Sequence, residues 1–175
     1  MLVLRATRKL RKGLPLSATD ADTSEGALGD WYVNRIVVDC QPLLLLVSSR
    51  CRLPMLARAR HVKQLPERLP EMIGDRIGRL GLASSIVDAE VRASRPVLVG
   101  KTIDRSITGQ MVDFAKAVAY YVPRAGWNDA ALRMVEERLA ETPCLASRPF
   151  DQVVFPDKAA IRILAEAWPA STTRH

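Results

Sequence analysis

The sequence is poor in the residues that build metal centres and disulfide frameworks. Among its 175 residues, only three are cysteine and two are histidine. Cys40, Cys51 and Cys144 form no Cys-x-x-Cys pair, and the histidines are His61 and His175. We therefore expect no structural metal site and no cofactor. Because cysteine is often buried and the number is odd, we expect reduced and mostly buried thiols.

Long hydrophobic runs are also missing. The longest apolar stretch, 42–47, is well below the roughly 20 residues that a membrane-spanning helix needs. The first residues, 1–5, lack the ordered regions of a signal peptide. Hydrophobic residues nevertheless make up 48% of the sequence, which is enough to build a buried core. At this length we expect one folded domain, spanning 1–175 and located in the cytoplasm.

Several catalytic signatures are absent as well. The sequence has no Gly-x-x-x-x-Gly-Lys-Ser loop, no Gly-x-Gly-x-x-Gly turn and no paired histidines with a carboxylate at helical spacing. Its densest polar stretch contains Lys101, Asp104, Arg105 and Ser106. A serine nucleophile needs a positioned base, whereas Asp104 or Ser106 would simply cap a following helix. We therefore expect that the protein is not an enzyme. The alternative hypothesis is that this loop has an enzymatic or nucleic-acid-binding role.

Positive charge exceeds negative charge. The 26 basic and 19 acidic side chains give a net charge of +7. The excess is visible near the N-terminus, at Arg5, Arg8, Lys9, Arg11 and Lys12. Such a charge invites an anionic partner. Because no aromatic residues interleave these cations, as they would on a surface that stacks single-stranded bases, a solvated basic face is the favoured interpretation.

The first part of the chain has the pattern of strands and loops. Residues 2–6 alternate as in a short strand, and 14–28, rich in Ser, Thr, Asp, Ala and Gly, predict a loop. A turn is expected at 40–42. Three further strands are expected at 31–39, 43–49 and 52–57. Together they predict an antiparallel meander.

The apolar period changes to three and four residues from about His61 onward, as in helices. Pro66 and Pro70 predict two short turns before a main helix that ends near Gly81. The other expected elements are helices at 84–91, 106–122, from 128 or 129 onward and 157–168, a strand at 96–100, and a flexible tail at 169–175. The predicted fold is a single α+β domain, with an antiparallel sheet from the N-terminal half packed against several helices.

The run Gln41-Pro42-Leu43-Leu44-Leu45 is the strongest indication of function. Gln41, Leu44 and Leu45 match the Gln-x-x-Leu-(Leu/Phe) form of peptides that dock on the bacterial sliding clamp. Such a peptide needs a glutamine held by hydrogen bonds and two apolar side chains that enter adjoining pockets. The same run is typical of a strand buried on both faces. Both interpretations stay open, because Leu44 and Leu45 can reach a partner only from an edge strand or after local opening.

A second run, Gln110-Met111-Val112-Asp113-Phe114, has a similar form, but Asp113 stands at the position where the clamp-binding form has a leucine. It lies in a predicted helix, with Met111 and Phe114 on the core face. Clamp peptides bind in an extended form, so we expect most of this match to be coincidence.

Six segments carry a resemblance to a known family. They are LRATRKL (4–10), GDWYVNR (29–35), LLLLVSSRCRLPML (43–56), LPERLPEMI (65–73), KTIDRSITGQMVDF (101–114) and ERLAETPC (137–144). Through these segments the chain resembles, over nearly its whole length, an uncharacterised family of bacterial domains.

Within that family the chain is most similar to a toxin that inhibits DNA replication. The resemblance implies the toxin of an atypical toxin–antitoxin pair, which binds the β sliding clamp (DnaN) and blocks replication elongation. It also implies an antitoxin that acts as a proteolytic adaptor and delivers the toxin to the ClpXP protease. Gln41, Leu44 and Leu45 are then the expected clamp contacts.

Overall fold

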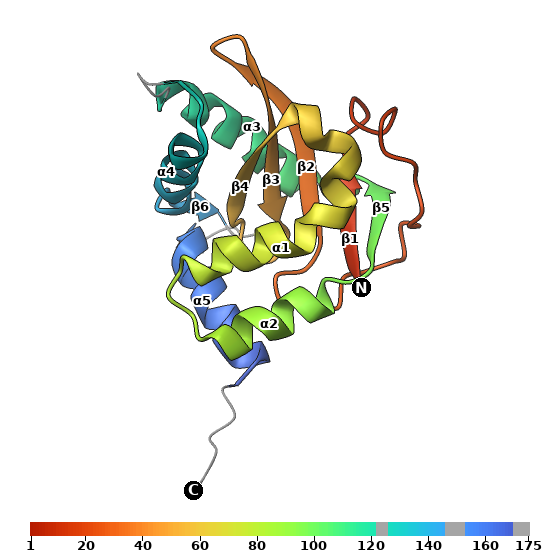
Figure 1. The fold of residues 1–175 in the computed structure, drawn as a ribbon, viewed down its shortest axis with the longest axis vertical. Helices are drawn as coiled ribbons and strands as arrows, with labels where there is room; N and C mark the ends of the chain where they lie inside the picture. Colours follow the sequence, from red (N-terminus) through yellow and green to blue (C-terminus); the bar gives the residue numbers. More distant parts are fainter. Residues whose placement is uncertain (122–125, 146–152, 170–175) are drawn as a thin grey trace, which may run out of the picture.

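A five-stranded sheet organises the computed structural model, which describes residues 1–121, 126–145 and 153–169 (Figure 1). The strands lie in the order β4-β3-β2-β1-β5, so β3 has a neighbour on each side. Their bounds are Leu2–Ala6 for β1, Trp31–Val38 for β2, Gln41–Ser48 for β3, Pro54–Arg58 for β4 and Val97–Lys101 for β5.

The predicted antiparallel meander is confirmed as β2-β3-β4. The remaining pairings are parallel, because β1 pairs with β2 on one side and with β5 on the other. The turn between β2 and β3 is formed by Asp39 and Cys40, whose φ angles are 50° and 57°, and Gln41 and Pro42 already belong to β3. Two residues with positive φ give a turn whose twist suits a hairpin.

Helices make up most of the second half of the chain, and the predicted α+β class is confirmed. Their bounds are Ala59–Gln64 for the 3-10 helix η1, Leu65–Gly78 for α1, Ser84–Ala93 for α2, Arg105–Tyr120 for α3, Asp129–Ala140 for α4 and Pro156–Ala167 for α5. A small sheet of β6 (Cys144–Leu145) and β7 (Val153–Val154) was not predicted. The expected tail, 169–175, lies outside the described residues except for Pro169.

The turns expected before the first long helix are only partly confirmed. The 3-10 helix η1 comes first, but α1 already begins at Leu65 and continues through Pro70. Pro66 lies in the first turn of α1, where a backbone N–H has no partner in the helix. Pro70 is buried beside Leu69 and Ile73. Burial of this apolar face compensates for the one hydrogen bond that Pro70 cannot donate to the carbonyl four residues earlier.

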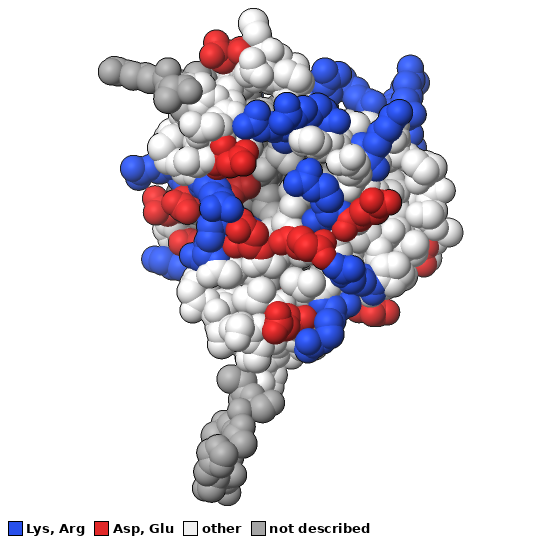
Figure 2. All heavy atoms as spheres, viewed as in Figure 1, with Lys and Arg blue, Asp and Glu red and all other residues white. Residues whose placement is uncertain are grey.

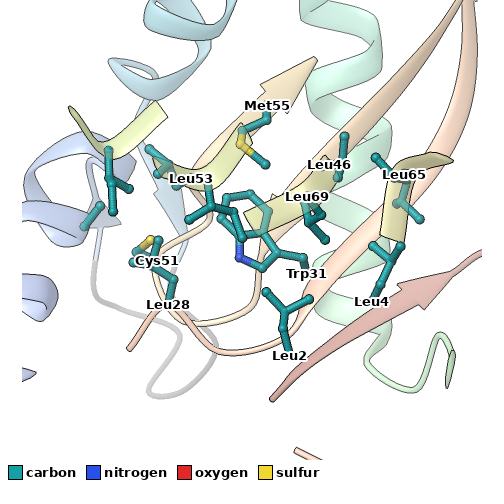
Figure 3. Close-up of a cluster of buried hydrophobic side chains, with 14 of the residues drawn as sticks. Leu2, Leu4, Leu28, Trp31, Leu46, Cys51, Leu53, Met55, Leu65 and Leu69 are labelled. Atoms are coloured by element: carbon teal, nitrogen blue, oxygen red, sulfur yellow. The ribbon is translucent and has the colours of Figure 1, made fainter. Parts of the chain in front are cut away.

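The helices cover both faces of the sheet (Figure 1). Helices α1, α2 and α5 pack on one face, and α3 and α4 pack mainly on the other. Figure 3 shows Trp31 in the middle of the first core, surrounded by Leu2, Leu46, Leu53 and Met55. Because Trp31 is fully buried, this core fixes the start of β2 and therefore the register of the hairpin that β2 forms with β3.

The segment 14–28 forms neither helix nor strand, but it is tied to the outer edge of β5. The N–H groups of Ser17 and Ala18 donate to the Val99 carbonyl at 2.8 and 2.9 Å. The N–H of Val99 donates to Ser17 Oγ at 2.9 Å. These bonds cover part of an edge that would otherwise present free backbone groups.

Candidate functional site

The β2–β3 hairpin ends in an exposed tip that includes the predicted contact Gln41. We define the tip as residues 37–42, of which Val38 is buried in the core and the others are exposed. Gln41 and Pro42 are exposed, and Val37, which lies opposite Pro42, is 65% exposed. The tip therefore presents an amide and two apolar side chains to solvent in the folded chain.

The other two predicted contacts, Leu44 and Leu45, lie inside the sheet. Both are fully buried, and β3 is paired with β2 on one side and β4 on the other. Adjacent residues of a strand point to opposite faces. Leu44 accordingly packs in the core beneath α1, whereas Leu45 packs in the core beneath α3 and α4. In the folded chain, β3 is not an edge strand and cannot offer both leucines to adjoining pockets of one partner.

The second glutamine run lies in α3, as expected. Gln110 is partly buried, and Met111 and Phe114 are buried in the core beneath α3 and α4. Their burial explains the apolar spacing of this run as helix packing.

The polar loop before α3 has the contacts of a helix start. Asp104 Oδ1 accepts a hydrogen bond from the Ser106 N–H at 2.7 Å, so Asp104 caps α3. Burial would raise the pKa of Asp104, but the hydrogen bonds from Ser106 and from the N–H of Ile107, together with the positive charge of Arg52, outweigh burial and lower it. Lys101 lies 3.0 Å from Asp20, and both side chains are about half exposed. Arg105 is exposed.

The hydroxyl group of Ser106 is held by a cation that was missed from the sequence. Arg52 Nη2 donates to Ser106 Oγ at 3.0 Å, and Arg52 Nη1 donates to the Ser49 carbonyl at 2.9 Å. An arginine cannot take up a proton, so it cannot serve as the base of a serine nucleophile. Arg52 is buried and has a φ of 63°. It lies 54 positions from Ser106 along the chain, and no sequence spacing indicates their contact.

A cleft of about 720 Å³ opens between β4, η1, α1 and α4, and Figure 2 shows it as a hollow near the centre of this face. Glu136 of α4 lies in its wall. Its Oε1 accepts a hydrogen bond from the Leu56 N–H at 2.7 Å, and its Oε2 accepts one from Arg79 Nη2 at 2.5 Å. Burial raises the pKa of Glu136, and these two hydrogen bonds act in the opposite direction. Glu136 was not among the predicted site residues, although a carboxylate four residues after the buried Leu132 is a visible exception on an apolar helix face.

The charges that line the cleft are largely paired with one another. Asp75 Oδ2 lies 3.3 Å from Arg79 Nε, and its Oδ1 lies 3.1 Å from Arg133 Nη2. Two further pairs join Arg58 to Asp129 and Arg95 to Glu71. These contacts tie α1, α4 and β4 together and cover the outer edge of β4 with side chains.

A basic surface borders the cleft on the side of η1. Figure 2 shows Lys and Arg side chains gathered along the upper and upper-right part of this face. We use the term basic surface for six exposed residues: Arg8, Lys9, Lys12, Arg35, Arg60 and Lys63. The cation Arg5 does not belong to it, because Arg5 is fully buried and pairs with Asp30 at 2.8 Å.

Within the described parts of the chain, no group of three or more His, Cys, Asp or Glu side chains is arranged to hold a metal ion. Over the same residues, no helix has the length and apolar character needed to span a bilayer.

The chain is thus a single-domain α+β protein whose exposed hairpin tip and basic surface lie outside its packed cores. It belongs to the family described as "Domain of unknown function (DUF6933)", whose model matches residues 3–159. No curated protein matches the chain.

Proposed function

We propose that the protein is a non-enzymatic toxin that inhibits replication elongation by binding the β sliding clamp in competition with other clamp-binding proteins. Support comes from the resemblance of the chain to the replication-inhibiting toxin SocB and from the exposure of Gln41 at the hairpin tip. The exposure of Gln41 carries the proposal, because a glutamine amide can be recognised without any change in the fold. The same resemblance supports an antitoxin that acts as a proteolytic adaptor and the ClpXP protease as further partners.

The burial of β3 decides how such a contact would be made. To bring Leu44 and Leu45 to a partner, β3 would have to leave the sheet and expose the five buried residues Leu43–Val47. At about 1.5–3 kcal/mol for each large apolar side chain, the cost is on the order of 10 kcal/mol. A whole domain is stable by only about 5–15 kcal/mol. In the folded protein the contact is therefore made by the tip, and Leu44 and Leu45 stay predicted contacts only for a chain whose β3 has opened.

The alternative role for the Lys101–Ser106 loop has weaker support. Asp104 caps α3, Ser106 accepts a hydrogen bond from Arg52, and Lys101 pairs with Asp20. These contacts account for the polar residues of the loop by the local structure alone.

Replacement of the exposed amide tests the proposal. Immobilised β sliding clamp is titrated with the wild-type chain, with Gln41→Ala and with the control Gln64→Ala, which removes another exposed glutamine away from the tip. Gln41→Ala should weaken binding by about tenfold or more, equal to about 1.4 kcal/mol, because a polar anchor is lost. Gln64→Ala should bind as the wild type does.

Before each titration, circular dichroism is used to check that the variant is folded. Equal affinity of wild type and folded Gln41→Ala would remove the tip from the proposal. A wild-type chain that does not bind the clamp at all would overturn the proposed function itself.

A further inference from the structure

The basic surface is assembled from three separate segments of the chain. The segment that carries Arg8, Lys9 and Lys12 is fixed to β2 by Thr7, whose N–H donates to the Val33 carbonyl at 3.1 Å and whose Oγ1 donates to Asn34 Oδ1 at 3.0 Å. Arg35 is the next residue of β2. The third segment, η1, follows β4 directly and carries Arg60 and Lys63.

Packing brings these three segments to one face of the sheet. Arg35 lies opposite Leu44 in the β2–β3 ladder, so its side chain projects on the same face as Leu44. Leu10 and Val62 both pack in the core that contains Leu44. The loop around Leu10 and the helix η1 therefore pack against the same core as Leu44, on the face of the sheet to which Arg35 projects.

Among the described residues, the cations of the basic surface have no ion-pair partner, unlike most of the arginines that line the cleft. In the described residues, none of the six is within ion-pair distance of a carboxylate, whereas Arg58, Arg79, Arg95 and Arg133 each have at least one such partner. The stretches 1–19 and 40–66 contain no Asp or Glu at all. The charge of this surface is therefore free to attract an external anion.

Two observations identify the class of anion. Protein interfaces are centred on large apolar or aromatic anchors. The exposed large hydrophobic side chains of the described residues include none from η1 or from the segment 7–13, and β2 contributes only Val37, which belongs to the tip. Surfaces that bind single strands stack bases on aromatic rings, and no Phe, Trp or Tyr occurs in 1–30 or 33–63. Cations without anchors or rings match the contacts that proteins make with the phosphates of a duplex.

We propose that the basic surface binds the phosphate backbone of a nucleic-acid duplex without sequence specificity. This binding does not rest on the clamp proposal, because Gln41 is not one of its residues. DNA and RNA duplexes share two rows of backbone phosphates. The experiment below distinguishes which of the two duplexes the protein binds more tightly.

The test is fluorescence anisotropy of labelled 20-base-pair DNA and RNA duplexes, titrated with the full chain over a series of salt concentrations. Each phosphate contact makes the slope of log K against log salt more negative by about 0.9 for duplex DNA. The variant Arg35→Gln/Arg60→Gln/Lys63→Gln loses three such contacts, so its slope should be less negative by about 2.7. Its binding should also be weaker by more than about tenfold at low salt. Whichever duplex binds more tightly identifies the nucleic acid.

A matched control removes the same charge elsewhere. Arg105→Gln/Lys116→Gln/Arg162→Gln also loses three exposed cations, and these lie on α3 and α5. It should keep the affinity to within about twofold, since its cations are not in the basic surface. Gln41→Ala should bind the duplex as the wild type does, which separates this proposal from clamp binding.

Three results would overturn the proposal. The first is a wild-type chain that shows no salt-dependent binding of either duplex at low salt. The second is an equal loss of affinity in the control variant, which would indicate that net charge alone attracts the duplex. The third is tighter binding to polyglutamate or to a single strand of equal charge, which would assign the surface to an acidic polypeptide or to unpaired bases.

Discussion

Two arginines near the N-terminus have opposite roles. Arg5 is fully buried, and its Nε donates to Asp30 Oδ2 at 2.8 Å while its Nη atoms donate to the carbonyls of Thr19 and Asp22. It holds the segment 14–28 against the sheet. Arg8, three residues later, has left β1 and is exposed. The position of each residue relative to the end of β1 therefore decides whether its charge is paired inside the fold or exposed to solvent.

The three cysteines should differ sharply in reactivity. Burial raises the pKa of Cys51 and of Cys144 to about 11 each, whereas Cys40 is exposed at the hairpin turn. At pH 8 only about one thousandth of a thiol with such a pKa is ionised, and the thiolate is the reactive form. With a chromogenic disulfide reagent, one thiol per chain should react rapidly at pH 8 and two more only after unfolding.

The matched control for this prediction is Cys40→Ser, which should lose the rapid reaction and keep the two thiols that react only after unfolding. Rapid reaction of two or three thiols in the native wild-type chain would contradict the burial of Cys51 and Cys144.

At the level of secondary-structure elements, we expect different residues of β3 to stabilise the core and to contact a partner. Leu44→Ala removes a fully buried side chain and should lower the free energy of unfolding by about 2–5 kcal/mol. Gln41→Ala changes an exposed residue and should stay within about 0.5 kcal/mol of the wild type. Urea denaturation measures both. A Leu44→Ala variant as stable as the wild type would show that Leu44 is not held in the core.

The local parts of the fold were predictable from the sequence, and the long-range pairings were not. The strand patterns and a turn near residue 40 specify a hairpin of neighbouring segments, and Asn128, one of the two expected starts, caps α4. The parallel pairing of β1 with β5 joins Leu2 to Val97, and no local pattern records such a partner. Pro70 illustrates a second limit, because packing of an apolar face outweighed the local preference of a proline.

The candidate site was predictable to the same limited degree. The turn residues around Gln41 indicated exposure, and the structure places Gln41 at the surface. Whether Leu44 and Leu45 would be exposed depended on the strand order, which sets β3 between β2 and β4. The basic surface depended on tertiary packing too, since Arg8 lies in a loop, Arg35 in β2 and Lys63 in η1.

At the scale of the whole molecule, side chains and loops cover both edges of the sheet. Glu136 accepts a hydrogen bond from the outward N–H of Leu56 on β4, and Arg76 Nε donates to the Pro54 carbonyl at 3.3 Å. On the other edge, Ser17 and its neighbour bond to Val99 of β5. Edges covered in this way resist pairing with another strand. A partner is therefore expected to use the side chains of the tip and the basic surface.

Hydrogen exchange of the chain alone and with saturating β sliding clamp tests most directly whether the folded tip makes the contact. If the folded tip makes the contact, the amides of Leu43–Val47 keep their protection in the complex, while the amides of the turn residues Asp39–Gln41 become more protected. Faster exchange of Leu43–Val47 in the complex would mean that β3 leaves the sheet to bind. That result, or unchanged exchange at 39–41, would contradict docking by the folded hairpin tip.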